Sequence, residues 1–498
     1  MGRPVRVRDE LSGSFSPGEP ERIGHDGHDR VENGSRAHGI VPFRFRLTAL
    51  AEAFGARRLA RSIVHFRPGM SIPFRLRVRR PRVRPEEIGT TADPYAPLRF
   101  VAFRWFILSL LPSTLAQQIQ AVVVGWQIYA LTHDPLALGL IGLSEALPFI
   151  GIALFAGHVA DRIDRRRIAL VSLTVMVGCA AMLFLFSFHL TRGSRVWPIY
   201  LVIALSGVAR SFMTPSRAAL AAELVPREMY PSASAWRSAA WQLAAVVGPA
   251  LGGLLYGFGS ARLAYGVASV LHLAGVVCLG QVHRTVIPVV EEHDSVWQSL
   301  GVGIRFVLHQ PVVLGAMALD MFSVLFGGAV ALLPIFASEI LHVGPQGLGI
   351  MQAAPAAGAV TMSLVLTHRP PMKRAGRALF IAVAGFGLSI IGFGLSRSFP
   401  LSVALLAVSG LFDMVSVVIR STLLQVFTPP QLLGRVSAVN SIFIGSSNEI
   451  GAFESGVAAK LLTAVPAVVF GGAMTLIVVA ATSWRVPELR RLREIRVD

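Results

Sequence analysis

The chain has very few lysines and cysteines. Only Lys373 and Lys460 are lysines, and neither follows a glycine in the pattern G-x-x-x-x-G-K-[ST], which excludes a phosphate-binding P-loop. Cys179 and Cys278 stand alone in apolar segments, so neither a disulfide framework nor a metal site is predicted. Charged residues make up 15% of the chain and hydrophobic residues 53%. This composition excludes an ordinary soluble protein and favours a bundle surrounded by lipid.

The basic residues are unevenly distributed. The formal net charge is +18, and all but two of the 46 basic residues are arginines, which is typical of a GC-rich bacterial genome. Residues 1–97 hold 18 arginines against 11 acidic residues and no apolar run long enough to cross a membrane. We expect a disordered cytoplasmic tail there, with Met70 as an alternative start of translation. No nucleic-acid partner is expected, because arginines placed in loops on one side explain the basic charge.

From Phe100 onward, apolar stretches alternate with short polar breaks. Each stretch can cross a hydrocarbon core of about 30 Å as a helix that rises about 1.5 Å per residue. The sequence predicts an all-α membrane protein whose twelve transmembrane helices form two pseudo-symmetric bundles of six. The expected spans are 100–130, 136–159, 167–190, 197–221, 234–256, 261–282, 312–338, 344–366, 377–396, 399–425, 434–459 and 464–484.

The breaks between the spans indicate the domain organisation. The longest break, 283–311, separates an N-terminal bundle (98–282) from a C-terminal bundle (312–484) and contains a predicted interfacial helix, Trp297 to His309. A basic tail, 485–498, follows. Arginines concentrate in the loops after even-numbered spans, so both termini are expected in the cytoplasm. At a constant offset of 203 residues, Arg217 matches Arg420, and further identities around them indicate a repeat of the kind that builds transporter halves.

The loop between spans 2 and 3 has the spacing G-x-x-x-D-R-x-x-R-R. It resembles the corresponding loop of the major facilitator superfamily of transporters. The resemblance implies a gating role in which Asp161 lies at the positive N-terminal end of helix 11, near Gly434. The alternative is a purely topogenic signal. The residues of this gating motif are Gly157, Asp161, Arg162, Arg165 and Arg166.

Span 5 contains Ala244-Ala-Val-Val-Gly248-Pro249-Ala-Leu-Gly252-Gly253. This segment resembles the g-x-x-x-G-P-x-x-G-G motif of proton-coupled exporters and departs from it only at Ala244. Pro249 removes one backbone hydrogen bond and the glycines permit close approach, so we expect a bend against span 8. The alternative is an ordinary packing face of small residues. Residues 98–484 resemble the exporter branch that includes siderophore and macrolide exporters.

Several polar residues lie in the middle of apolar spans. An ionised side chain at mid-bilayer is disfavoured by about 2.5–3.5 kcal/mol, so each one calls for an explanation. The resemblance implies that spans 1, 4, 7 and 10 line a central cavity. The residues predicted to line it are Gln117, Gln118, Gln120, Arg210, Asp320 and Asp413, with Glu145, Glu449 and Glu454 as a second set.

These residues predict a site for substrate and protons. Arg210 is expected to hold an anionic group or a partner, while Asp320 and Asp413 take and release protons. Alternatively, Arg210 and Asp413 form a purely structural ion pair. Asp320 has no obvious basic partner. Arg217 and Arg420 are expected near helix ends, where carbonyl groups and lipid headgroups can satisfy them.

We therefore expect a secondary active transporter in the bacterial inner membrane. It is predicted to be a monomer that exchanges protons for a small organic molecule by alternating access, without a cofactor. An importer or lipid flippase of the same fold is the nearest alternative. A membrane enzyme is disfavoured, because no metal-binding cluster or Ser-His-Asp arrangement occurs at loop-facing positions. A regulator that binds nucleic acid or another partner through its basic tail is the remaining class.

Overall fold

The computed structural model describes residues 93–189, 195–283, 296–369 and 374–492. The described residues all belong to one compact unit of the chain, Ile88–Asp498. The expected tail, 1–97, falls almost entirely outside the described residues, so its disorder stays a prediction. Within the described residues, the regular structure consists of helices, and there is no strand.

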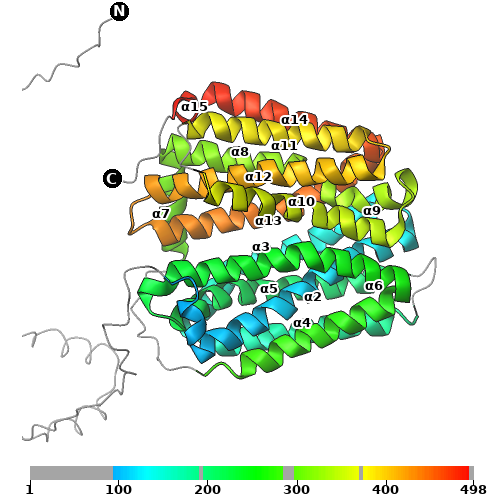
Figure 1. Ribbon diagram of the computed structural model, residues 1–498, viewed down its shortest axis with the longest axis horizontal. Coiled ribbons are helices and arrows are strands. Elements are labelled where there is room, and N and C mark those ends of the chain that lie inside the picture. Colours follow the sequence, from blue (N-terminus) through cyan, green and yellow to red (C-terminus); the bar gives the residue numbers. More distant parts are fainter. Residues whose placement is uncertain (1–92, 190–194, 284–295, 370–373, 493–498) are drawn as a thin grey trace, which may run out of the picture. The chain divides into compact units, whose positions relative to one another are not determined.

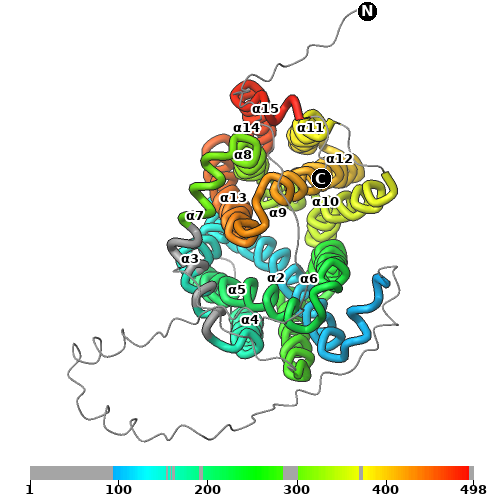
Figure 2. The backbone as a smooth tube through the Cα atoms, turned by 90° about the vertical axis from the view of Figure 1, so that its left-hand side faces the viewer, coloured from blue at the N-terminus to red at the C-terminus, as the bar shows by residue number. Residues whose placement is uncertain are grey.

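The helices follow the apolar stretches of the sequence. A first set, called here the N group, comprises α2 (Val101–Thr132), α3 (Pro135–Arg162), α4 (Arg165–Phe186), α5 (Trp197–Glu223) and α6 (Tyr230–Gly280). The remaining long helices form the C group, which comprises α8 (Pro311–Phe326), α10 (Gly344–Thr367), α11 (Ala375–Leu395), α12 (Phe399–Phe427), α13 (Leu433–Leu462) and α14 (Ala464–Arg485). Figure 2 shows the two groups with their helices seen nearly end-on.

Short elements complete the chain. The segment that continues α8 consists of η4 (Ala329–Leu332), α9 (Leu333–Ile335) and the π-helical turn η5 (Phe336–Ile340). Helix α7 (Val296–His309) lies where the interfacial helix is predicted, and α15 (Pro487–Arg491) follows α14. Three-residue to four-residue 3₁₀ turns precede α2 and α6, namely η2 (Ala96–Arg99) and η3 (Arg227–Met229).

Helix α6 is a pair of helices joined without a loop. Ser260 has φ 81° and ψ 171°, which no helical residue adopts, and the chain reverses there. The sequence predicts a break between 256 and 261, and Ser260 lies within it. Ten described segments are long and apolar enough to cross a membrane when Arg227–Gly280 is counted once. Helix α13 is not among them, because its interior serines, asparagines and glutamates make it too polar by that measure.

The helices alternate in direction, so the bundle has two sides. The tail side is where α2 begins and α14 ends, and the far side is where α2 turns into α3 and α13 into α14 (Figure 1). Within each group, α2 packs along α6 and α3 against α5, while α10 and α11 both pack against α12. Between the groups, α3 packs against α13 and α6 against α10.

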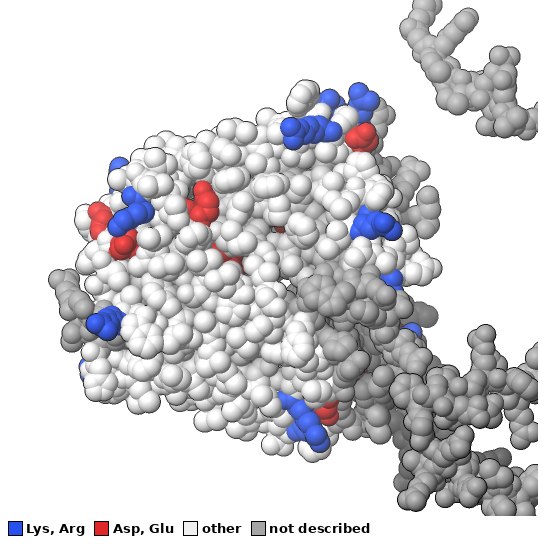
Figure 3. All heavy atoms as spheres, turned by 180° about the vertical axis from the view of Figure 1, so that it is seen from behind, with Lys and Arg blue, Asp and Glu red and all other residues white. Residues whose placement is uncertain are grey.

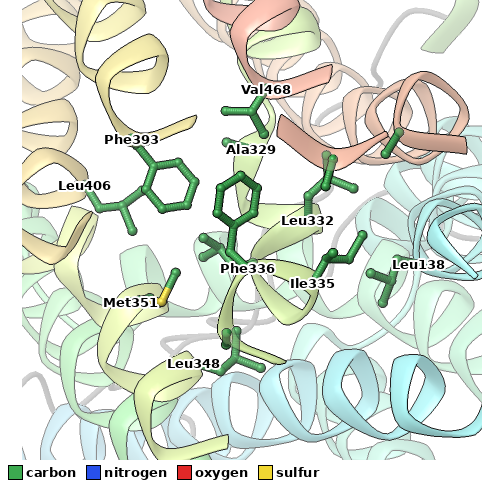
Figure 4. Packing of buried hydrophobic residues seen from close by; sticks show 14 of the residues in the cluster. Leu138, Ala329, Leu332, Ile335, Phe336, Leu348, Met351, Phe393, Leu406 and Val468 are labelled. Carbon is green, nitrogen blue, oxygen red and sulfur yellow. The ribbon is translucent and has the colours of Figure 1, made fainter. Parts of the chain in front are cut away.

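Several of the closest contacts between the groups lie in the far half of the helices. The Cβ that an alanine would add at Gly139 of α3 would meet the Cα of Gly456 on α13 at 3.0 Å. The segment from Ala329 to Ile340 fills the far-side core, where the rings of Phe336 and Phe393 have centroids 4.6 Å apart (Figure 4). Glycine and close packing therefore hold the two groups together at this depth.

The surface of the bundle matches a lipid environment. On the face shown in Figure 3, lysines and arginines gather towards the two ends, and a broad band between them is largely uncharged. Many large apolar side chains are exposed, including Leu147, Phe155, Val171, Ile381 and Leu388, each at 59% or more. Such exposure is expected where acyl chains, rather than water, surround the helices.

Candidate functional site: two ion-pair clusters between the helices

The first cluster joins the two helix groups. Arg210 on α5 forms an ion pair with Glu145 on α3, and its Nη1 lies 3.8 Å from Oε1 of Glu449 on α13. Helices α3 and α5 can approach closely because Gly207 has no side chain, and a Cβ there would lie 2.8 Å from the Glu145 carbonyl oxygen. We call Glu145, Arg210 and Glu449 the bridging cluster.

The predicted pair of Arg210 with Asp413 is wrong. The two residues were matched by depth along equivalent helices, but α5 and α12 belong to different groups and Arg210 points towards α3 and α13. Equal depth in a bilayer does not make two side chains share a direction. Glu145 and Glu449, placed in the second set by the sequence, are the actual partners of Arg210.

The second cluster lies within the C group. Arg420 on α12 forms an ion pair with Asp320 on α8, and its Nη2 lies 4.0 Å from Oδ1 of Asp413. Side chains on a helix lean towards its N-terminus, so Arg420 extends from nearer the tail side towards Asp413, two turns earlier on the same face. Only 12% of the Arg420 side chain is exposed. Asp320, Arg420 and Asp413 are called the C-group cluster.

This cluster corrects two further expectations. Asp320 does have a basic partner, and Arg420 is satisfied by carboxylates rather than by carbonyl groups or lipid headgroups. The sequence contained a signal for Arg420, since it repeats Arg217 at the offset of 203. The sequence did not show how far the Arg420 side chain extends. Arg420 lies near a helix end, but its long side chain reaches the depth of Asp320.

A small cavity borders the C-group cluster. Its volume is about 90 Å³, and it lies between α8, α12 and α13. Its walls are mostly apolar, with polar groups from Arg420, Ser421 and Asn440. Asp413 does not line it, but 47% of the Asp413 side chain is exposed. The lining residues are Val313, Ala316, Met317, Val417, Arg420, Ser421, Leu423, Leu424, Asn440 and Ile444.

The predicted glutamines of α2 lie inside the bundle with unused polar atoms. Nε2 of Gln117 and Oε1 of Gln120 are buried without a hydrogen-bond partner in the described structure. Gln118 packs against α6, and a Cβ added at Gly248 would overlap its side chain. Because a buried amide without a partner is unfavourable, Gln117 and Gln120 are available to bind water or a ligand.

The exporter motif forms the contact between α6 and α10. A Cβ added at Gly253 would lie 2.9 Å from the Gly349 Cα and closer still to the Pro345 carbonyl oxygen. Gly252 packs in the same way against Ile119 of α2. The close approach to span 8 expected from the glycines is confirmed. The bend at Pro249 stays a prediction, because the non-helical dihedral angles inside α6 belong to Ser260.

The gating motif is described only in part. The side chains of Gly157, Asp161 and Arg162 fall outside the described structure, so a contact of Asp161 near Gly434 stays a prediction. Arg165 and Arg166 bind within the N group. Nη1 of Arg165 lies 2.5 Å from Oε1 of Glu223 at the end of α5, and Nη2 of Arg166 donates to the Gly280 carbonyl at 2.5 Å. These arginines therefore tie α4 to the tail-side ends of α5 and α6.

Glu454 does not join either cluster. It shares one face of α13 with Phe443, Ile450 and Leu461, which are 37%, 41% and 77% exposed. That face points away from the one that carries Glu449. No hydrogen bond or ion pair joins Glu454 to any other residue that the structure describes. Glu454 therefore provides a natural comparison for Glu449.

Two polar contacts between the groups were not predicted from the sequence. On the far side, the Tyr129 hydroxyl donates to Glu339 of η5, and Nζ of Lys460 lies 3.1 Å from Oδ1 of Asp134. Both contacts lie at loops or helix ends, where charged residues are ordinary. The sequence therefore contained no signal that would distinguish them from a solvated surface.

Long apolar helices with charged side chains paired between them define a polytopic membrane protein. The chain belongs to the transmembrane secretion effector family, whose model matches residues 92–496. It is thus a transporter of the major facilitator type, of the exporter branch, and not an enzyme.

Curated relatives and solved structures agree with this assignment. The enterobactin exporters EntS of Citrobacter koseri and Escherichia coli O1:K1 are each 27% identical over 79% of this chain and 94% of their own length. A peptide transporter POT in complex with sulfate shares the fold with TM-score 0.62 at 13% identity, covering 81% of this chain and 99% of its own. The human organic anion transporter MFSD10 follows with TM-score 0.55 at 17% identity, over 78% and 99%.

Proposed function

We propose that the chain is a proton-coupled exporter of a small organic molecule, embedded as a monomer in the bacterial inner membrane. Counting α6 as two helices, α8 to η5 as one span and α13 as another gives twelve crossings in two groups of six. The arginine-rich loops then lie on the tail side, which is the cytoplasmic side with both termini.

The charge of the two clusters is the observation that supports proton coupling most strongly. Each cluster sets two carboxylates against one guanidinium, so each carries a net charge of −1 when both acids are ionised. Burial among apolar helices disfavours an uncompensated charge. Uptake of a single proton makes either cluster neutral. Each cluster therefore has a place for one exchangeable proton.

The C-group cluster suggests how a proton and a substrate exchange. While Asp320 is ionised it holds Arg420 in an ion pair, and Asp413, 47% of whose side chain is exposed, can bind a cationic or hydrogen-bond-donating group of a substrate. Protonation of Asp320 removes the main counter-charge of Arg420, whose Nη2 lies 4.0 Å from Oδ1 of Asp413, so Arg420 pairs with Asp413 and displaces the substrate. Loss of the proton restores the pair of Arg420 with Asp320 and frees Asp413 for the next substrate. Proton and substrate thus compete for one cluster, as exchange requires.

The bridging cluster suggests how protonation changes the conformation of the protein. Glycine packing and two polar contacts join the two groups in the far half, which supports a state closed on the far side under the proposed topology. Arg210 and Glu145 belong to the N group, whereas Glu449 belongs to the C group. Neutralising Glu449 weakens the attraction between the groups at mid-depth, which favours rocking towards the opposite state.

Export is the favoured direction. The curated relatives bear the name enterobactin exporter, and the glycines of the exporter motif form the contact between α6 and α10. A siderophore-like or drug-like molecule is therefore the first substrate class to test. An importer or lipid flippase with the same fold remains the competing function.

Everted membrane vesicles provide the test. Vesicles containing the protein are energised with an inward-acidic gradient and given a panel of siderophores, macrolides and other drugs. Gradient-dependent accumulation that is lost in Asp320→Asn, at unchanged protein abundance, is expected. Accumulation driven only in right-side-out vesicles would establish an importer, and transfer of fluorescent lipid without any accumulation would establish a flippase.

A further inference from the structure

Two arginines at matching positions in the helix groups have different partners. Arg217 on α5 and Arg420 on α12 are 203 residues apart in the repeat. Each reaches the first helix of its own group. Arg420 pairs there with Asp320, whereas Nη2 of Arg217 donates to the hydroxyl of Ser113 on α2 at 2.7 Å. The same cation therefore meets a carboxylate in one group and a neutral hydroxyl in the other.

Arg217 is buried without a counter-charge. Its side chain is 8% exposed, and no carboxylate lies within ion-pair distance of it in the part of the chain that the structure describes. Arg237 on α6 adds a second positive charge nearby, which repels the first. Removing one partner of a buried ion pair is strongly destabilising in general, because the remaining charge is desolvated without compensation. Arg217 has the environment of such a half-pair.

His272 adds an imidazole without a hydrogen-bond partner to the region around Arg217. It is fully buried on α6, and neither ring nitrogen has a hydrogen-bond partner in the described structure. Ser109 donates to the carbonyl of Gly275, one turn further along α6, which holds α6 against the part of α2 that carries Ser113. A neutral imidazole has one N–H to donate. Arg217 and His272 together supply several donors to a region without a negative acceptor.

We propose that this region of the N group, between Arg217, His272 and Ser113, is a binding site for a small monovalent anion such as chloride. The anion takes the place that the Asp320 carboxylate occupies in the C group. It accepts hydrogen bonds from the guanidinium and the imidazole, and it neutralises the buried charge.

A carboxylate built into the chain tests the site directly. Ser113→Asp places a permanent negative charge beside Arg217, and Ser113→Asn is the matched neutral control of nearly the same size. Thermal unfolding of the purified, detergent-solubilised protein is followed while chloride replaces gluconate at constant ionic strength. The wild-type protein and Ser113→Asn should show a saturable rise of a few degrees. Ser113→Asp should show none and should unfold, in gluconate, no lower than the chloride-saturated wild type.

Other outcomes overturn the proposal. A wild-type midpoint that is the same in chloride and gluconate would mean that water satisfies Arg217. Persistence of the chloride effect in Ser113→Asp would place the anion elsewhere. If Ser113→Asp does not fold, Arg217→Gln decides, because it should abolish the chloride dependence, and retention of that dependence would refute the site. Acetate and inorganic phosphate are titrated in parallel, and stabilisation by these alone would exclude a halide site and indicate a headgroup or substrate instead.

Discussion

Glu449 on α13 and Arg210 on α5 face each other across the boundary between the two helix groups, with 3.8 Å between Oε1 and Nη1. Arg210 is also paired within its own group to Glu145. Glu449 is therefore the carboxylate of this cluster that can leave when the groups move apart, while Glu145 stays with the arginine. A charge at this position couples protonation to conformation only if the two groups separate there during transport.

Glu449→Gln should therefore reduce gradient-driven transport at least about tenfold, which corresponds to roughly 1.4 kcal/mol of lost coupling. Protein abundance should stay near the wild-type level, because Arg210 keeps Glu145. Transport is measured in everted vesicles at equal protein content. Glu454→Gln is the control, since Glu454 is on the same helix and has no partner among the described residues. Equal loss in both variants would contradict the role assigned to the bridging cluster.

Asp320→Asn should abolish accumulation driven by the proton gradient and weaken substrate binding, because Arg420 then pairs with Asp413. The amide resembles a protonated carboxyl group in shape but cannot lose a proton. Binding should also lose its dependence on pH between the acidic and neutral ranges. In the wild type acidification should weaken substrate binding, because a proton on Asp320 releases Arg420 to pair with Asp413. Binding that strengthens on acidification in the wild type would refute competition at this cluster.

Arg420→Ala should lower stability by about 3–5 kcal/mol, since it leaves buried Asp320 without its cation. The effect should be much smaller in an Asp320→Asn background, where no charge is stranded. Thermal unfolding of the two single variants and the double variant completes a double-mutant cycle. In a separate test, the charge exchange that combines Asp320→Arg with Arg420→Asp should restore expression. Independent, additive losses would show that the two residues do not interact.

Gly253→Ala should separate α6 from α10, because its Cβ would overlap the Pro345 carbonyl oxygen and the Gly349 Cα. Overpacking of this kind destabilises by about 1–3 kcal/mol, and transport should fall with it. Gly178→Ala on α4 is the matched control, since nothing lies within 4 Å of a Cβ there. The control should be neutral or slightly stabilising, as expected for alanine in a helix. Melting temperatures and vesicle transport distinguish the two.

Reporter fusions decide the orientation of the chain. A reporter that is active only in the cytoplasm should function after Arg167 or Arg374 and remain silent after Arg195 or Arg397. Arg167 lies in the first turn of α4, and the other three sites lie in loops between helices. The arginine-rich segments around Arg167 and Arg374 favour the cytoplasmic side. The reverse pattern would refute the proposed topology, and with it the assignment of the tail side to the cytoplasm.

The sequence by itself determined the helices and their order. Apolar runs of span length leave the backbone no alternative to helix in lipid, so most expected spans and observed helices agree to within a few residues. The expected span 312–338 is the exception, because α8 ends at Phe326 and short helical turns continue it. The close approach at Gly253 was also predictable, because glycine removes the side chain that would prevent it. So was the depth of the charged residues, since depth follows from position along a helix.

Only the tertiary structure decided which of those charged residues meet. Direction around each helix, the reach of Arg420 and the packing of α3 against α13 are set by contacts between residues distant in the chain. Depth alone suggested that Arg210 pairs with Asp413. In the packed structure Arg210 instead pairs with Glu145 and lies near Glu449, and Asp320 pairs with Arg420. The repeat also predicted that Arg217 and Arg420 would be alike. Their different partners, Ser113 and Asp320, appear only when each group's first helix is placed beside them.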